Sequence, residues 1–254
     1  MTDRITDRIE IVNADCYTLL DAWPSDAALV TDPPYGIAYP CNFKTRGRGA
    51  LADTHDWPDV HGDDEPFNPA PFLRFASVCL WGAINFADKL PPQSGWLVWD
   101  KRTRNDVGVN DQADGEAAWT NRVKGLRIFR HMWNGFWRDS ERGEAWHPTQ
   151  KPVALMGWAL MKMALPAETL VIDPFAGSGS LGIACMRRGL RYLGVEIDPD
   201  HYAVMRDRLQ REARQPELFQ PSCDTADTGK SDCRDGSLDL PFETHERGGR
   251  DAQE

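Results

Sequence analysis

The sequence predicts an α/β fold with a largely parallel central sheet. Short apolar runs alternate with longer segments of helical periodicity, which is the pattern of strands joined by helices. The run 27–31 is apolar up to Thr31, as is typical of a strand buried on both faces of a parallel sheet. With 254 residues and 41% hydrophobic content, the chain can bury one full core.

The elements follow one another in a regular order. We expect strands at 9–12, 27–31, 78–81, 96–99, 170–172 and 192–195. Short helices are predicted at 17–22 and 85–90, and longer ones at 153–164, 178–188 and 199–211. Residues 36–70 show no periodicity, and residues 101–145 give a mixed strand and loop signal. We expect one domain over 1–212 and a disordered acidic tail over 213–254.

Composition excludes several classes of protein. There is no apolar run of about 18 residues, so we expect no membrane span, and the polar N-terminus does not resemble a secretory signal. The six cysteines form no C-x-x-C pair, which predicts free thiols in a cytoplasmic protein and no metal site. Since the net charge is −10, binding to nucleic acid would need a local basic surface. The candidates for it are Lys44, Arg46 and Arg48; Lys101, Arg102 and Arg104; and Arg122, Lys124, Arg127 and Arg130.

A glycine-rich segment, Asp173 to Gly179, lies between a predicted strand and a predicted helix. Glycines there allow a sharp turn and a close approach of the backbone to a ligand. Glu196 ends the next strand, where an acid can bind ribose hydroxyls. The pattern predicts a site for a nucleoside-containing cofactor, and an NAD-dependent oxidoreductase would share it. The alternative is a glycine-rich turn without a ligand.

A second motif, Asp32-Pro33-Pro34-Tyr35, follows the strand predicted at 27–31. The exocyclic amine of a nucleic-acid base is a poor nucleophile because its lone pair is delocalised into the ring. Asp32 and the Pro33 carbonyl can accept its two hydrogens, and the ring of Tyr35 can stack on an extruded base. The motif therefore suits methyl transfer to an amino group, although a proline-rich turn is the alternative.

Together these motifs resemble a known family. Asp-Pro-Pro-Tyr, a downstream Phe-x-Gly-x-Gly and the stretch His147 to Pro152 are similar to those of amino-group DNA methyltransferases. The catalytic motif precedes the cofactor motif, as in the permuted β group of that family. The resemblance implies a Rossmann-like class I methyltransferase fold, S-adenosylmethionine as cofactor and DNA as partner.

The resemblance also indicates the target. Asp32, where other members have Ser, favours a site-specific enzyme for the N6 amino group of adenine, of the restriction-modification type. Cytosine N4 is the main alternative, and RNA or a protein side-chain amide remain open as acceptors. An NAD-dependent oxidoreductase would leave Asp32 to Tyr35 unexplained, and a non-catalytic DNA-binding subunit would not need that motif intact.

The resemblance assigns roles to individual residues. The catalytic motif is Asp32, Pro33, Pro34 and Tyr35. Asp15 and Cys16 match the segment that reads the cofactor adenine, although Asp15 could also cap a helix. Lys151 could meet the methionine carboxylate. The full set expected at the cofactor is Asp15, Cys16, Asp32, His147, Thr149, Lys151, Asp173, Phe175, Ala176, Gly177, Ser178, Gly179, Glu196 and Ile197.

The regions that could recognise DNA are small. They are 36–70 and 101–145, so strong sequence specificity would call for a homodimer in which two subunits share the duplex. At the start of the tail, the peptide Gln215 to Phe219 resembles short peptides that bind the bacterial sliding clamp. The frayed end of the last helix is the alternative for that peptide.

Overall fold

A computed structural model describes residues 1–38, 60–92, 95–102, 113–134, 137–141, 146–147 and 149–215. By their contacts the residues group into two units, Met1–Pro216 and Glu217–Glu254. The second unit lies outside the described residues, so the tail over 213–254 remains a prediction beyond Gln215. The same holds for the basic cluster Lys44, Arg46 and Arg48, and for most of the peptide Gln215 to Phe219.

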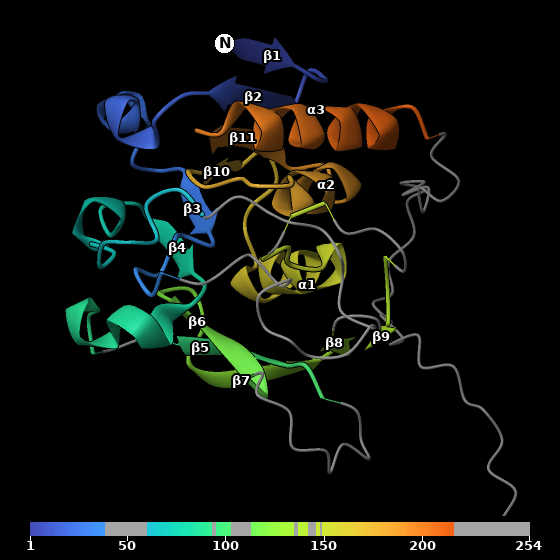
Figure 1. Cartoon of the computed structure of the whole chain (residues 1–254). Coiled ribbons are helices and arrows are strands. Elements are labelled where there is room, and N and C mark those ends of the chain that lie inside the picture. Colours follow the sequence, from blue (N-terminus) through green and yellow to red (C-terminus); the bar gives the residue numbers. More distant parts are fainter. Residues whose placement is uncertain are drawn as a thin grey trace, which may run out of the picture. The chain divides into compact units, whose positions relative to one another are not determined.

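The described residues of the first unit form a nine-stranded sheet in the order β1-β2-β11-β10-β3-β4-β6-β5-β7 (Figure 1). Its five neighbouring strands β2, β11, β10, β3 and β4 are all parallel, which confirms the predicted parallel core. Strand β1 joins one side antiparallel, β6 is antiparallel to both β4 and β5, and β7 is parallel to β5. The strands are β1 (Thr2–Arg4), β2 (Ile9–Asn13), β3 (Ala28–Thr31), β4 (Ser77–Leu80), β5 (Gly95–Asp100), β6 (Gly115–Thr120), β7 (Gly125–Arg130), β10 (Leu170–Asp173) and β11 (Arg191–Glu196), with β8 (Trp133–Asn134) and β9 (Trp137–Arg138) forming a separate pair.

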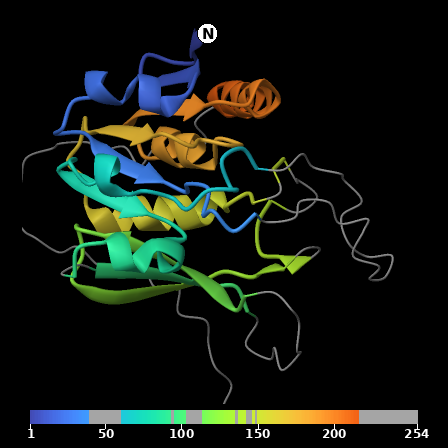
Figure 2. The same cartoon turned by 60° about the vertical axis from the view of Figure 1, so that its left-hand side comes forward.

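Helices cover both faces of the sheet, and each face has its own apolar core (Figure 2). One face packs against α1 (Val153–Met163), α2 (Ser180–Arg187) and α3 (Pro199–Ala213). The other packs against short 3-10 segments: η1 (Cys16–Thr18), η2 (Leu20–Ala22), η4 (Ala70–Phe72) and η5 (Ala83–Lys89). Asp198 caps α3 by accepting from the amides of Asp200 and His201, and Pro199 fits the first turn.

Two expectations about the elements are corrected. The helices predicted at 17–22 and 85–90 are 3-10 segments, and the second bends at Phe86. Residues 115–120 and 125–130, expected as part of a mixed strand and loop region, form the regular strands β6 and β7. Strand β6 has the sequence Gly-Glu-Ala-Ala-Trp-Thr, which has low strand propensity and is stabilised by a neighbour on each side.

Two further findings bear on the predicted class. Among the described residues, no helix is both long and apolar enough to cross a membrane. Three cysteines of the described part, Cys16, Cys79 and Cys185, are free thiols, as predicted, and all three are buried.

Candidate active site

The carboxyl ends of the five parallel strands form one edge of the sheet, and the predicted site residues gather there. Asp15 follows β2, Glu196 ends β11, Asp173 ends β10 and Asp32 follows β3. From β10 the chain continues to β11 on one side, whereas from β3 it continues to β4 on the other. Ligands of open α/β sheets bind at such a switch point, so the topology places the two sequence motifs beside each other at the expected ligand site.

The glycine turn between β10 and α2 has the backbone that its sequence predicts. Gly177 has a φ of 50° and Gly179 a φ of 78°, both in the left-handed region that favours glycine. A Cβ on Gly179 would lie 2.8 Å from Cγ of Met205, so a larger residue would not fit. Glu196 fixes the turn from the next strand, because its Oε2 accepts from the Gly177 amide at 2.8 Å and its Oε1 from the Asp198 amide at 2.9 Å.

Asp173 is buried beneath this turn and links three strands. Its carboxylate accepts from the Thr31 hydroxyl of β3 at 2.7 Å and from the Tyr192 hydroxyl of β11 at 3.3 Å. Burial raises the pKa of Asp173 to about 7. The structure therefore gives Asp173 a place under the predicted cofactor site, with its oxygens bound to protein groups.

The second motif is the centre of a buried chain of charges. The Tyr35 hydroxyl donates a hydrogen bond to Oδ1 of Asp32 at 2.5 Å, and the Lys151 ammonium binds Oδ2 of the same carboxylate. Lys151 also lies 3.2 Å from the Tyr35 hydroxyl and 2.9 Å from Oε2 of Glu116. Glu116 in turn binds Lys101, so carboxylates and ammoniums alternate along the chain.

The charges in this chain support one another. Burial raises the pKa of Asp32, and the neighbouring Lys151 opposes that shift. Although burial disfavours ionised Glu116, Lys151 and Lys101 hold its pKa at about 2. Burial alone would lower the pKa of Lys151, but Asp32 and Glu116 raise it. Glu116 and Lys151 are therefore charged at neutral pH, and Lys151 favours the ionised form of Asp32.

Two residues that the sequence motifs did not include position Tyr35. Oδ1 of the buried Asp63 accepts from the amides of Tyr35 and Gly36, both at 2.8 Å. The ring of Tyr35 lies against Gly82, where an added Cβ would be 1.8 Å from Cε1 of that ring. Asp63 lies in the predicted 36–70 loop, and Gly82 follows a predicted strand, but neither sequence position shows that it meets Tyr35.

The stretch before α1 lies between the two motifs. His147 faces Gly177, at 3.7 Å from the position of an added Cβ, and its ring is 4.3 Å from that of His201. Burial lowers the pKa of His147 to about 3, so the ring is neutral. Its Nδ1 accepts from the Thr149 amide at 3.2 Å. Lys151, four residues after His147, binds Asp32, which follows β3.

The remaining predicted residues border the turn. Asp15 caps η1 by accepting from the Tyr17 amide at 2.9 Å, which confirms the helix-cap interpretation. Burial raises the pKa of Cys16 to about 12, so it is a thiol. Phe175 packs in an aromatic cluster with Phe67 and Phe72, at ring distances of 6.0 and 5.7 Å. Ala176 and Ser178 are buried, and Ile197 is exposed.

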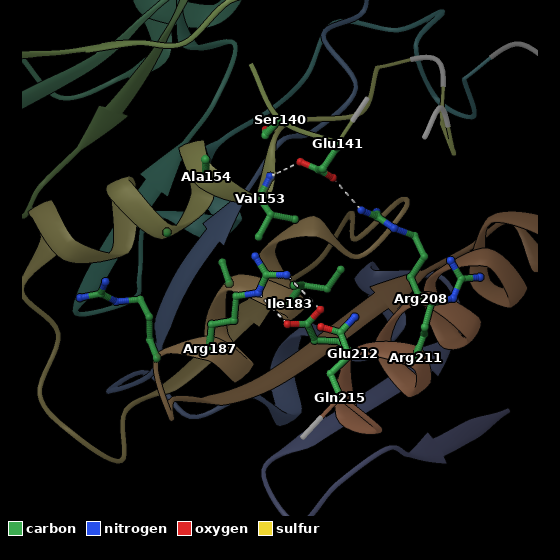
Figure 3. Close-up of a pocket in the computed structure, with 13 residues that line it drawn as sticks. Ser140, Glu141, Val153, Ala154, Ile183, Arg187, Arg208, Arg211, Glu212 and Gln215 are labelled. Carbon is green, nitrogen blue, oxygen red and sulfur yellow. Dashed lines mark hydrogen bonds and ion pairs between the residues drawn. The ribbon is translucent and has the colours of Figure 1, made fainter. Parts of the chain in front are cut away.

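A cavity of about 460 Å³ lies elsewhere, between α1, α2 and α3 (Figure 3). Four arginines and two glutamates are among the residues that line it: Arg187, Arg188, Arg208, Arg211, Glu141 and Glu212. None of the predicted site residues lines this cavity. The candidate active site is therefore defined by the strand ends and their side chains, not by this cavity.

The sheet order and the two motifs at its carboxyl edge define the class as a Rossmann-like class I methyltransferase fold with permuted motif order. A solved structure of the PvuII DNA methyltransferase, described as cytosine-N4-specific, has this fold with a TM-score of 0.51. It is 14% identical in sequence, and the match covers 85% of this chain and 89% of that one.

Sequence comparisons find similar proteins among DNA methylases. The N6_N4_Mtase model, described as DNA methylase, matches residues 87–207. The chain is 27% identical over 252 residues to the type II methyltransferase M2.LlaDCHI of Lactococcus lactis subsp. cremoris, a match that covers 80% of this chain and 90% of the relative. It is also 30% identical over 84 residues to the type II methyltransferase M2.DpnII of Streptococcus pneumoniae, where the match covers 33% of this chain. The chain is therefore similar to DNA methylases of the N6/N4 type over residues 87–207.

The matches to other relatives are shorter. The chain spans 31% of the length of M2.DpnII and 47% of the length of the type II methyltransferase M.Cfr9I of Citrobacter freundii.

Proposed function

We propose that the protein is a DNA methyltransferase that moves the methyl group of S-adenosylmethionine to an exocyclic amino nitrogen of a base. The observation that carries this proposal is the position of Asp32. Its carboxylate, bound by Tyr35 and Lys151, lies at the sheet edge on the strand next to that of the Gly177 turn. An ionised acceptor beside a cofactor turn is what an amino-methyl transfer needs.

Asp32 acts on the amino group of the base. The bound cofactor supplies an electrophilic methyl group on its sulfonium. Asp32 and the Pro33 carbonyl accept hydrogen bonds from the amine, which returns lone-pair density to the nitrogen. The carboxylate of Asp32 would take up the proton that the amine gives up as it receives the methyl group. Asp32 favours this change because positive charge develops next to it.

Residues of the turn would hold the cofactor. The left-handed Gly177 and Gly179 let the backbone come close to it, and Glu196 would accept from the ribose hydroxyls. Each Glu196 oxygen already accepts one backbone hydrogen bond and has a further lone pair. The exposed Asp15 and Ile197 border this position, where they would meet the adenine.

The contacts of Lys151 suggest a different role from the one that the sequence predicted. The sequence suggested the methionine carboxylate as its partner, whereas here Lys151 binds Asp32 and Glu116. We propose that its main task is to keep Asp32 ionised. Binding to the methionine carboxylate remains a prediction.

Adenine N6 is the proposed target, and cytosine N4 is the second candidate. The presence of Asp32 in the first position of the motif favours adenine by family resemblance. The cytosine alternative is supported by one observation, that the PvuII enzyme with the same fold is described as cytosine-N4-specific. Asp32 can accept from either amine, so the acceptor geometry suits both bases.

One experiment tests function and target together. The protein is incubated with unmodified DNA and isotopically labelled S-adenosylmethionine, and the DNA is digested to nucleosides for mass spectrometry. We expect labelled N6-methyladenine from the wild type and about a hundredfold less from Asp32→Ala, with cofactor binding retained. Labelled N4-methylcytosine alone would contradict the choice of base. An Asp32→Ala protein with full activity would contradict the mechanism.

A further inference from the structure

A buried arginine of α3 binds the back of the glycine turn. Arg208 is 5% exposed, and its guanidinium donates to the Ser178 carbonyl at 2.6 Å. The same nitrogen lies 3.3 Å from the Ser180 hydroxyl, in the first turn of α2. Since Glu196 holds the Gly177 amide, the turn is bound from two sides by two charged groups on different elements.

The second terminal nitrogen of Arg208 binds a different part of the chain. It donates to Oε1 of Glu141 at 3.0 Å (Figure 3). Glu141 uses its other oxygen to accept from the Val153 amide at 2.8 Å, at the start of α1. Its Oε1 also accepts from the Gln150 side chain at 3.0 Å. Glu141 therefore binds residues on both sides of Lys151 in the sequence.

The conformation of Glu141 shows that its surroundings determine its position. Its φ is 51°, in the left-handed region that a residue with a Cβ seldom adopts. The side chain of Glu141 is 13% exposed, and that of Arg208 is 5% exposed. A buried ion pair of this kind adds little net stability over apolar side chains of the same volume, because both charges lose their hydration. The Arg208–Glu141 pair therefore acts mainly by fixing the relative positions of the groups that it binds.

We infer that Arg208 and Glu141 are positioning residues that set the distance between the cofactor turn and the Lys151–Asp32 pair. This inference rests on the proposed function of the site. One guanidinium binds the turn, and through Glu141 and Gln150 it fixes the segment that brings Lys151 to Asp32. The pair borders the cavity of about 460 Å³, so the ion pair and not close packing on that side determines the spacing.

The chain offers a matched control in the same cavity. Arg187 of α2 binds Glu212 of α3 with an Nε to Oε1 distance of 2.6 Å (Figure 3). It also borders the cavity, but both of its hydrogen bonds go to Glu212, its arginine side chain is 56% exposed, and it binds neither the turn nor the stretch before α1. Removing it changes an arginine–glutamate pair of the same cavity without changing the connection between the two motifs.

The test compares Arg208→Lys, Glu141→Gln, their double variant and the control Arg187→Lys in the full-length protein. For each we would measure the thermal midpoint, the dissociation constant of S-adenosylmethionine, and the single-turnover rate on DNA at saturating cofactor. Arg208→Lys keeps the charge but cannot bind Ser178 and Glu141 together. We expect both single variants to fold and to lose about tenfold or more in single-turnover rate, because a small misplacement is costly in catalysis. We expect the double variant to be no worse than the poorer single one, and Arg187→Lys to match the wild type.

The outcomes separate this inference from the proposed function. A wild type that neither binds S-adenosylmethionine nor methylates DNA would contradict the proposed function itself. With an active wild type, rates of Arg208→Lys and Glu141→Gln equal to that of Arg187→Lys would overturn the inference. So would additive losses in the double variant, or losses that only follow the fraction of unfolded protein, since these would show an ordinary structural role.

Discussion

Substitution of Tyr35 provides the sharpest test of the site, because the sequence motif and the structure predict different activities for Tyr35→Phe. If the ring only stacked on the base, Tyr35→Phe would be nearly silent. In the structure the Tyr35 hydroxyl donates to Oδ1 of Asp32 at 2.5 Å and lies 3.2 Å from the Lys151 ammonium. A hydrogen bond to a charged group is worth about 1.5–3 kcal/mol, and its loss here would leave Asp32 with one fewer donor. We therefore expect Tyr35→Phe to lower the single-turnover rate by about tenfold or more.

The dependence on pH adds a second signature. The Tyr35 hydroxyl lowers the pKa of Asp32, so its removal raises that pKa further. Since the ionised carboxylate is the acceptor, activity is lost as the pH falls through the pKa, and the acid limb should move to higher pH in Tyr35→Phe.

The assay is a single-turnover measurement over a range of pH at saturating cofactor. A matched control is Tyr202→Phe, because the Tyr202 hydroxyl donates to Oδ2 of Asp3 at 2.8 Å outside the site. It should leave the rate and the pH profile unchanged. A Tyr35→Phe protein with the wild-type rate and the wild-type acid limb would refute the coupling of the hydroxyl to Asp32.

Three further predictions follow from the geometry. Gly82→Ala should lower activity by about tenfold or more, because the added Cβ would displace Tyr35. Gly189 is the control: it has a similar φ of 65° but no heavy atom within 4 Å of an added Cβ, so Gly189→Ala should lose only about 1–2 kcal/mol of stability from the backbone conformation. Equal activities of the two variants would show that the Tyr35 contact is unimportant. Arg130 and Arg102 lie at the edge of the sheet formed by the carboxyl ends of its parallel strands, whereas Lys124 comes before the start of β7. Arg130→Gln should therefore reduce the slope of log binding constant against log salt concentration for DNA by about 0.9, and Lys124→Gln should leave it unchanged. Because burial raises the pKa of Asp173 to about 7, the folded state binds its proton more tightly than the unfolded state, and stability should fall by up to about 4 kcal/mol as the pH rises from about 4 to 7. Thermal midpoints of wild type and Asp173→Asn over that range would test this, and parallel curves would contradict it.

The parallel core could be predicted because its strands carry a clear signal. Strands such as β3 and β10 are buried on both faces, so their sequences are continuous apolar runs. Strand β7 gives no such signal, since most of its side chains are exposed at the side of the sheet, including Leu126 and Ile128. Its pairing with β5 is long-range and leaves no local pattern in the sequence.

The same distinction holds for the site. The residues of the two motifs are close in sequence, and parallel strand ends bring the motifs to one edge. The residues that hold them in place, such as Asp63, Glu116 and Arg208, come from distant segments. Glu116 reaches Lys151 across 35 positions from a strand that the sequence did not reveal, and no local pattern marks it as a partner.

The charge of the site supports the proposed reaction in a way that the motifs alone do not. Asp32 and Glu116 alternate with Lys101 and Lys151, so the two carboxylates and the two ammonium groups balance each other when Asp32 is ionised. A second anion close to Lys151 would compete with Asp32 for the ammonium group. A sulfonium close to Asp32 would instead be attracted by the negative charge of the ionised carboxylate. In the proposed reaction a fixed Asp32 would stabilise positive charge on the amino nitrogen without reorganisation. In the proposed function, Lys151 and Glu116 would hold this carboxylate in place and favour its ionised form before the cofactor binds.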